Sequence, residues 1–202
     1  MLNEKISSLL NNVEGEFGVY FEDIQDHNKV MINENLIFCA ASTIKIPLVA
    51  LVLKEYEEGK FDINDKVDIK LENRVGGTGV IRNLDKSFKP TILDLMNLAL
   101  VVSDNIATNQ LIDIVGGFGK INEFSQSIGL NNTKFQRKML DLKSLNEGLD
   151  NFTTAKDLGT LLTLIAEGKC VSKKSSELII KILKTQQFRQ KLPNFIPAVT
   201  SY

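Results

Sequence analysis

Ser42 and Lys45 stand three positions apart at the start of an apolar helical pattern. Residues i and i+3 lie on one face of a helix, so the lysine is expected to reach the serine hydroxyl. A serine hydroxyl is a weak nucleophile until a base takes its proton, and a neutral lysine amine can act as that base. The pair therefore predicts nucleophilic catalysis by Ser42 with Lys45 as its activator.

The sequence around Lys45 favours its burial. Ile44 and Ile46 flank it, and the pattern stays apolar nearly all round to Leu53, which is typical of a buried helix. Burial disfavours the charged ammonium and lowers its pKa, toward the range in which a general base works near neutral pH. The alternative is a helix-capping Ser42 followed by a solvated Lys45, and the apolar neighbours argue against it.

A second polar group, Ser103-Asp104-Asn105, follows 58 residues after Lys45 and separates two apolar helical patterns. Its side chains are therefore expected at a packed junction. Ser103 is predicted to pass a proton between Lys45 and a leaving nitrogen. Asn105 is predicted to hold Lys45 on one side and a substrate amide on the other. The alternative is structural, with Ser103 or Asp104 capping the helix that begins at Ile106.

Together these motifs resemble the penicillin-recognising serine enzymes, and most closely the class A β-lactamases. The resemblance extends over essentially all 202 residues. Besides Ser42-x-x-Lys45 and the Ser-Asp-Asn group, it includes Gly59-Lys60-Phe61-Asp62, Gly77-Thr78-Gly79 and Asn151-Phe152-Thr153-Thr154.

The resemblance implies a serine β-lactamase-type hydrolase that opens the β-lactam ring of penicillin- and cephalosporin-like antibiotics through an acyl-enzyme on Ser42. Lys45 would activate Ser42, Ser103 would relay a proton, and Asn105 would bind the side-chain amide of the substrate. The Ser42 backbone N–H would be one donor of the oxyanion hole.

One departure from the family lies in the loop over residues 131–152, where class A enzymes carry a glutamate that activates the deacylating water. Counting from Arg137 places Met139 at that position, and a methionine cannot act as a base. Aligning on Leu145-Asn146-Glu147 instead places Leu142 there.

Asp141 is the nearest carboxylate and the candidate substitute for that glutamate. The alternative for Asp141 is an ion pair with Arg137 or Lys138 that holds the loop.

A second departure is the absence of the family's Lys-Thr-Gly motif. It would lie on a strand that is expected to start near Val199, and the chain stops at Tyr202, so we expect a family member truncated before that motif. Two further functions stay open. One is a penicillin-binding-type peptidase or esterase with slow deacylation. The other is a truncated, non-catalytic β-lactam-binding relative.

The order of the predicted elements indicates an α+β, β-lactamase-like fold, with a mostly helical subdomain beside an incomplete antiparallel sheet flanked by helices. Residues 1–62 are expected to form the N-terminal part of the α/β subdomain, with a helix, a hairpin and the nucleophile helix. Residues 63–190 are expected to form an all-α subdomain with the Ser-Asp-Asn group and an omega-like loop. Residues 191–202 would start the return strand to the sheet.

Within these parts, a helix over residues 2–13 should pack a hairpin over residues 17–32. Further helices are expected over residues 43–58, 93–101, 106–115, 121–128, 155–167 and 172–184, with a flexible segment at 75–79 and an ordered surface loop at 131–152. Two strands do not make a stable sheet alone, so the open sheet edge is expected to pair with another copy of the chain.

The bulk composition excludes several partners. The 25 acidic residues nearly cancel the 24 basic ones, for a net charge of -1, so nothing indicates nucleic acid or an anionic membrane. Cys39 and Cys170 are far apart and are expected to be reduced and buried. With His27 as the single histidine, a zinc site or a histidine-based triad has little to build from. We expect no metal and no cofactor, and a small β-lactam as the substrate.

The compartment stays open at this stage. The N-terminal residues lack the long apolar core of a signal peptide, and the longest apolar run, from Ile46 to Leu53, is too short to span a bilayer. We therefore expect a soluble chain. The family resemblance implies export, so the choice between the cytoplasm and an exported location is unresolved.

Overall fold

The computed structural model describes residues 2–191. The helices are α1 (Leu2–Leu10), α2 (Lys45–Glu57), α3 (Ile92–Val101), α4 (Asn105–Ile114), α5 (Phe118–Ser127), α6 (Leu142–Asn146), α7 (Ala155–Ala166) and α8 (Lys173–Leu183). The strands are β1 (Val19–Glu22), β2 (Lys29–Ile32), β3 (Phe38–Cys39) and β4 (Phe152–Thr153). Three short 3-10 turns are η1 (Ala41–Ile44), η2 (Leu71–Asn73) and η3 (Ile81–Asn83).

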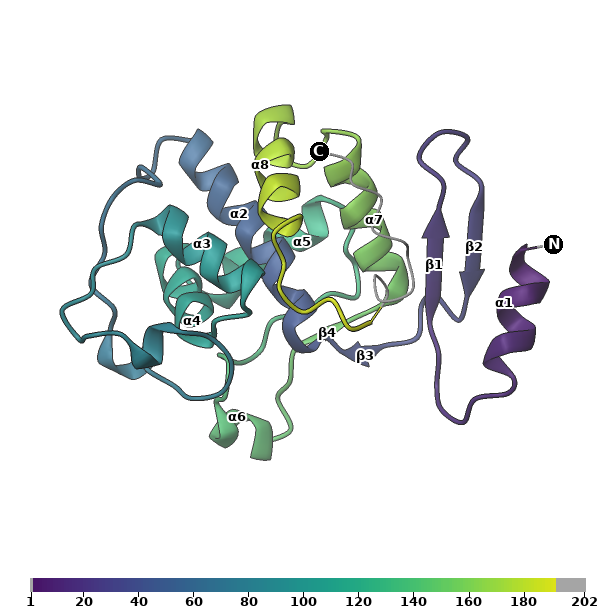
Figure 1. The fold of residues 1–202 in the computed structure, drawn as a ribbon, viewed down its shortest axis with the longest axis horizontal. Helices are drawn as coiled ribbons and strands as arrows, with labels where there is room; N and C mark the ends of the chain where they lie inside the picture. The colour runs from purple at the N-terminus through teal and green to yellow at the C-terminus, as the bar shows by residue number, and fades with distance from the viewer. Residues whose placement is uncertain (1, 192–202) are drawn as a thin grey trace.

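Helix α2 runs through the middle of the helical body and contacts α3, α4, α5 and α8 (Figure 1). Its apolar side chains point in all directions, and Leu48, Val49 and Leu53 are at most 1% exposed. Full burial of such side chains contributes roughly 1.5–3 kcal/mol each. The predicted burial of this helix is confirmed, and its N-terminal end is held rigidly by the packing.

Helices α3 and α4 adjoin one another on either side of the Ser-Asp-Asn group. The Thr91 side chain caps α3 in a reciprocal capping box with Asp94. Asp104 caps α4 by accepting a hydrogen bond from the Ala107 N–H. The chain therefore breaks between two buried helices, as the sequence predicts, and presents the polar group at their junction.

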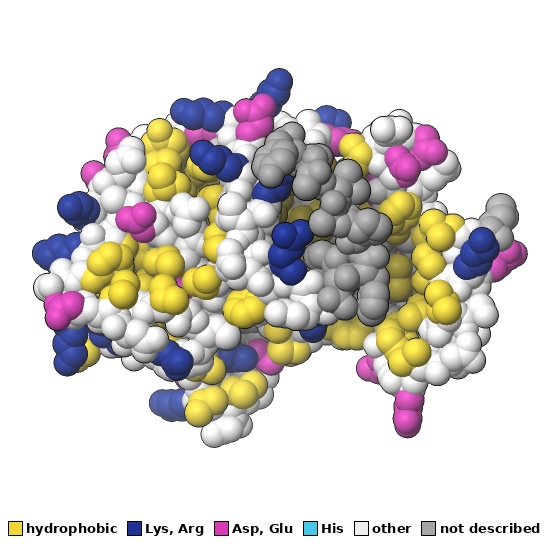
Figure 2. Space-filling model, viewed as in Figure 1, with side chains coloured by type: hydrophobic (Ala, Val, Ile, Leu, Met, Phe, Trp, Pro, Cys, Tyr) yellow, Lys and Arg dark blue, Asp and Glu magenta, His cyan; other side chains and the backbone are white. Residues whose placement is uncertain are grey.

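Strands β1 and β2 form the predicted antiparallel hairpin, with Val19 opposite Ile32. One face of β1 packs on α7, and there Gly159 is required, because a Cβ on it would lie 2.0 Å from the Tyr20 ring. Phe17, Val19 and Phe21 alternate with Gly18, Tyr20 and Glu22, a pattern that predicts one buried face, but Phe21 is 45% exposed. Helix α1 contacts β2 but buries no residue of its own. Figure 2 shows hydrophobic side chains at this end of the molecule.

Two local predictions from the sequence are corrected. The segment 131–152, expected as a loop, contains α6 and ends in β4. Strand β4 pairs with β3, which directly precedes η1, the turn that contains Ser42 (called the nucleophile turn after its proposed role). Helix α5 begins at Phe118, three residues before the predicted start at residue 121, and Gly117, with a φ of 91°, directly precedes it. The β3–β4 pair is what attaches the 131–152 segment beside Ser42.

The mixed composition of helices and two small antiparallel sheets confirms the α+β class. The division at residues 62 and 190 stays a prediction. The return strand expected near Val199 lies outside the described residues. No helix between residues 2 and 191 combines the length and the apolar character needed to cross a bilayer.

Candidate active site

A chain of hydrogen bonds connects Lys45 to Ser42 through Ser103. Lys45 Nζ donates to Ser103 Oγ at 2.8 Å, and Ser103 Oγ donates to Ser42 Oγ at 2.7 Å. The contact that the helical spacing predicts between Lys45 and Ser42 therefore runs through the Ser103 hydroxyl. A hydroxyl both donates and accepts, so Ser103 can carry a proton between Ser42 and Lys45 in either direction.

Lys45 is buried, at 1% exposure, and is held by neutral partners. Its Nζ donates to the Ser103 carbonyl oxygen at 2.7 Å and to Asn105 Oδ1 at 3.1 Å. Burial lowers the pKa of Lys45 to about 8, against a smaller opposing effect of the Asp104 charge. At pH 7 about a tenth of the lysine is then neutral, compared with well under a thousandth for a solvated lysine.

Asn105 connects Lys45 to the mouth of the site. Its Oδ1 accepts from Lys45, and its Nδ2 donates to the Gly76 carbonyl oxygen at 3.3 Å. Its backbone N–H donates to the Thr78 carbonyl oxygen at 3.2 Å. These bonds fix Asn105 between the base and the outer wall, which fits its predicted part in substrate binding.

Ser42 lies in η1, the turn that leads directly into α2. The Thr43 N–H and hydroxyl both donate to the Ala40 carbonyl oxygen, at 3.1 and 2.6 Å. The Ala40 N–H in turn donates to the Asn151 carbonyl oxygen at 2.8 Å. Ser42 itself is exposed. It is therefore an accessible hydroxyl on a fixed turn at the N-terminal end of a long helix, where the helix dipole favours negative charge.

Asp104 holds the wall opposite the nucleophile turn. The carboxylate is 1% exposed, and its Oδ2 accepts from the Val80 and Ile81 N–H groups at 2.7 and 2.9 Å. Gly79 has a φ of 113°, and a Cβ on it would lie 2.3 Å from the Asp104 carboxyl. The glycine-containing segment that the sequence marks as flexible is therefore fixed against Asp104.

A cavity of about 280 Å³ opens beside Ser42. Its lining comes from the nucleophile turn, from the segment around residue 78, from the start of α4 and from both arms of the 131–152 segment. The lining residues are Ala41, Ser42, Gly77, Thr78, Asn105, Arg137, Met139, Leu140, Asp150 and Asn151. The two ionised side chains among them neutralise each other, because Arg137 pairs with Asp150 through Nε at 2.8 Å and a terminal nitrogen at 2.7 Å.

Met139 occupies the wall of this cavity, and its backbone is clamped by Asn109 of α4. Asn109 Oδ1 accepts from the Met139 N–H at 2.7 Å, and Asn109 Nδ2 donates to the Met139 carbonyl oxygen at 3.2 Å. Asn109 is not among the site residues that the sequence predicts. It follows Asn105 by four positions, so a search along that helix face would have found it.

Asp141 lies elsewhere, at the start of α6. It accepts hydrogen bonds from the Ser144 N–H at 3.0 Å and from the Ser144 hydroxyl at 2.7 Å. These bonds hold the pKa of the Asp141 carboxyl below its usual range. The alternative ion pair does not form either, because Arg137 and Lys138 pair with other carboxylates. The structure thus brings Ser42, Lys45, Ser103 and Asn105 together and places Asp141 at a helix cap.

Three of the six non-glycine residues with positive φ values between residues 2 and 191 lie at or next to the cavity. Ala41, Ser103 and Leu140 have φ values of 46°, 55° and 57°, in the left-handed region that residues with a side chain rarely adopt. Each such residue costs on the order of 1–3 kcal/mol and persists only where its surroundings hold it. Their grouping at one place supports a functional role for the cavity.

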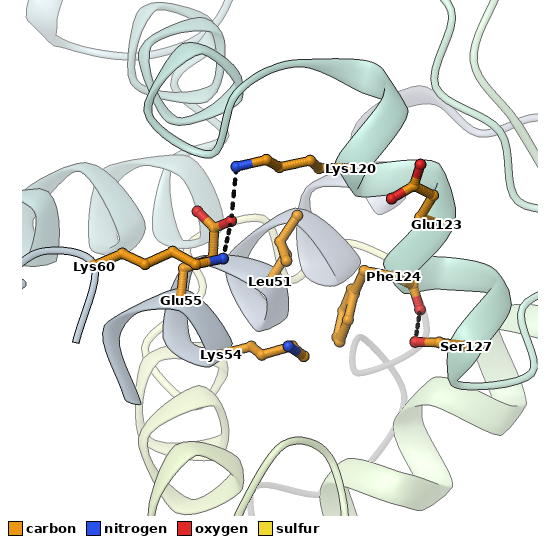
Figure 3. A pocket seen from close by; sticks show the side chains of 8 residues that line it. All are labelled: Leu51, Lys54, Glu55, Lys60, Lys120, Glu123, Phe124 and Ser127. Atoms are coloured by element: carbon orange, nitrogen blue, oxygen red, sulfur yellow. Dashed lines mark hydrogen bonds and ion pairs between the residues drawn. The ribbon is translucent and has the colours of Figure 1, made fainter. Parts of the chain in front are cut away.

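A larger cavity, of about 410 Å³, lies between α2 and α5 (Figure 3). Three of its charged groups pair with one another: the buried Glu55 accepts from Lys60 at 2.9 Å and from Lys120 at 3.4 Å. Leu51 and Phe124 form part of its lining. None of the predicted catalytic residues lines it.

The remaining reactive side chains are peripheral. Cys170 is buried, as predicted, but Cys39 is exposed and its thiol donates to the Asp150 carboxylate at 3.0 Å. Cys39 precedes the nucleophile turn on a two-residue edge strand, which explains its exposure. His27 lies in the hairpin turn beside Glu22. Among residues 2–191, no three His, Cys, Asp or Glu side chains are grouped to hold a metal ion.

Comparison with known proteins gives one family. The family model described as "Beta-lactamase enzyme family" matches residues 1–201. Beta-lactamase CTX-M-8 of Citrobacter amalonaticus is 29% identical over 153 residues, which cover 76% of this chain and 52% of that protein. The chain spans about half the length of the first curated relatives that it matches.

Solved structures give the same result. A β-lactamase from Sphaerobacter thermophilus has a TM-score of 0.87 at 26% identity, over 96% of this chain and 73% of that one. A point mutant of PBP-A, solved as an acyl-enzyme complex with penicillin G, has a TM-score of 0.85 at 26% identity, over 94% of this chain and 70% of that one.

Proposed function

This chain belongs to the beta-lactamase enzyme family, and from that premise we propose that it opens β-lactam rings through an acyl-enzyme on Ser42. The observation that carries the proposal is the hydrogen-bonded chain from Lys45 through Ser103 to Ser42, at 2.8 and 2.7 Å. Lys45 is the base, Ser103 is the relay and Ser42 is the nucleophile, and Asn105 binds the side-chain amide of the substrate.

In the acylation step, Ser42 Oγ attacks the β-lactam carbonyl carbon, and its proton passes through Ser103 Oγ to the Lys45 amine. The carbonyl oxygen takes the negative charge and lies at the N-terminal end of α2, where the Ser42 N–H and the helix dipole stabilise it. The C–N bond of the ring then breaks. The ring nitrogen takes back the proton from Lys45 through Ser103, which restores the neutral amine.

Hydrolysis of the ester completes the reaction: water adds to the acyl carbon, Ser42 Oγ leaves with a proton, and the opened acid departs. No carboxylate of the cavity is free to activate that water. Asp150 is occupied by Arg137 and by the Cys39 thiol, and Met139 stands in the wall with an apolar side chain.

That apolar wall supports a second candidate function, a penicillin-binding-type peptidase or esterase whose acyl-enzyme turns over slowly. The PBP-A mutant, which has a similar fold, has been solved as an acyl-enzyme complex with penicillin G. A relative that binds β-lactams without hydrolysing them would stop at the same adduct.

One experiment separates the candidates. The chain is incubated with benzylpenicillin and with a chromogenic cephalosporin, and intact mass and absorbance are followed in parallel. Continuous turnover at many equivalents supports the β-lactamase. A single stable adduct supports the slow enzyme or the binding protein, and hydrolysis of an ester or peptide substrate then distinguishes these two. Ser42→Ala is the control, and full activity in that variant would remove Ser42 from its proposed role.

Association of two copies through the open edge of the β1–β2 sheet remains a proposal, and so does export from the cytoplasm. Sedimentation velocity tests the first: a single species at monomer mass across a hundredfold range of concentration would rule it out.

A further inference from the structure

A polar cluster behind the cavity is centred on Lys138. Lys138 Nζ donates to Asn73 Oδ1 at 2.7 Å and pairs with Asp113 Oδ1 at 2.7 Å. Asn73 is fully buried, and its Nδ2 donates to Asp113 Oδ2 at 2.8 Å and to Gln110 Oε1 at 3.0 Å. Every polar atom of the Asn73 side chain therefore has a partner, and one of those partners is Lys138.

The cluster joins the two walls of the catalytic cavity. Lys138 immediately precedes Met139 and Leu140, which form one wall. Asn73 ends η2, and the chain runs from it within five residues to Gly77 and Thr78, which form the opposite wall. The Lys138–Asn73 bond is thus a direct connection between the segments that carry the walls.

The front of the cavity has a matching contact. A Cβ placed on Gly77 would lie 2.9 Å from Leu140 Cδ1, so the Leu140 side chain packs directly on the Gly77 backbone. Leu140 is held in its strained left-handed conformation while making this contact. The two walls therefore touch through an apolar contact, and the segments that carry them are also joined through the charge-assisted hydrogen bonds of Lys138.

The charges of the cluster are maintained near neutral pH. Burial alone would raise the pKa of the Asp113 carboxyl, but hydrogen bonds from Lys138, Asn73 and Lys70 outweigh it and hold that pKa below its usual range. The Lys138 ammonium therefore faces an ionised carboxylate, and charge-assisted bonds of this kind are about twice as strong as neutral ones.

We propose that Lys138, held by Asn73 and Asp113, is a positioning residue that sets the distance between the two walls of the cavity and so selects β-lactams by the bulk of their acylamino side chain. The selection among β-lactams rests on the proposed function, whereas the part of Lys138 in joining the two walls does not depend on it. Without the Lys138–Asn73 bond, Leu140 still contacts Gly77 directly, and each wall keeps its own bonds to α4, through Asn109 and through Asn105.

Lys70 supplies a matched control. It also pairs with Asp113, at 3.2 Å, and it is the second cation on the same carboxylate. Its side chain is half exposed and joins no part of the Met139–Leu140 wall. Lys70→Met and Lys138→Met thus remove the same charge from the same partner, and only Lys138→Met cuts the connection between the walls.

The first measurement is amide hydrogen exchange, which needs no substrate. In Lys138→Met, exchange at the Met139 and Leu142 N–H groups and at the Val80 and Ile81 N–H groups should become about tenfold faster than in Lys70→Met. If exchange rates in both variants stay within twofold of those in the unmodified chain, the proposal that Lys138 holds the two walls together is wrong. If Lys138→Met does not fold, Lys138→Ala, which also removes the donor to Asn73, takes its place.

The second measurement is the ratio of second-order acylation constants for benzylpenicillin and for 6-aminopenicillanic acid, which lacks the acyl group. Lys138→Met should change this ratio at least about fivefold, and Lys70→Met should leave it within twofold. The pH midpoint of acylation should stay where it is, because Lys45 is untouched. If the acylation constants for both substrates fall by the same factor, the proposal that Lys138 affects substrate selection is wrong. If the unmodified chain reacts with neither compound, the proposed function fails, and hydrogen exchange still decides on the connection.

Discussion

Replacing Ser103 with glycine separates the effect on proton transfer from the effect on stability. Ser103 has a φ of 55°, and glycine adopts that conformation without strain, so Ser103→Gly removes the hydroxyl while relaxing the backbone. Lys45 keeps two of its three hydrogen bonds, to the carbonyl oxygen of residue 103 and to Asn105. The free energy of unfolding should therefore change by less than about 1 kcal/mol.

The acylation rate should respond far more strongly. The 2.8 and 2.7 Å bonds that carry the proton from Ser42 to Lys45 are both lost. General acid–base catalysis contributes about 10²–10⁴-fold, so the rate constant for acylation should fall by that factor, equivalent to about 2.7–5.4 kcal/mol of activation free energy.

Stopped-flow acylation by benzylpenicillin, together with thermal unfolding, measures both quantities. Thr78→Ala is the control, because the Thr78 hydroxyl donates to the Ser103 carbonyl oxygen at 2.7 Å and lies in the same network outside the relay. It should lose less than about tenfold. An acylation rate in Ser103→Gly within threefold of the unmodified chain would refute the relay and would require direct proton transfer from Ser42 to Lys45.

Three further predictions concern the base, the apolar wall and the glycine turn. The pKa of Lys45 is lowered to about 8, and the neutral amine is the active form. The acylation rate constant should therefore rise about tenfold per pH unit below pH 8 and level off above it. A flat profile between pH 6 and 8 would contradict this. Met139→Glu places a carboxylate in the cavity wall and should speed deacylation at least about tenfold with little change in acylation, as measured by the decay of the adduct mass. Gly79→Ala should destabilise the fold by more than about 2 kcal/mol in chemical denaturation, because its Cβ would meet the Asp104 carboxyl; a loss under 0.5 kcal/mol would show that the turn adapts.

The proposed pair of Ser42 and Lys45 could be predicted because its signals are local. The spacing of Ser42 and Lys45 defines a helix face, and the apolar neighbours of Lys45 indicate the burial that lowers its pKa. For Ser103 the sequence predicts a part in proton transfer, but it does not predict the positions of its hydrogen-bond partners. Those positions depend on how α3 and α4 pack against α2, which periodicity does not specify.

The supporting residues could not be predicted for a related reason. Lys138 lies 65 positions from Asn73, and Arg137 and Asp150 are ordinary charged residues in the sequence. Their pairing follows from the folding of the 131–152 segment, where the β3–β4 pair and the cap at Asp141 decide which side chains meet. Asn109 is the exception, since it shares a helix face with Asn105.

Peptide mapping after incubation with benzylpenicillin at pH 8 tests the central claim most directly. The account predicts one equivalent of penicilloyl adduct, located on Ser42, in the unmodified chain and none in Ser42→Ala. An adduct on another residue, or an adduct of equal yield in Ser42→Ala, would contradict it.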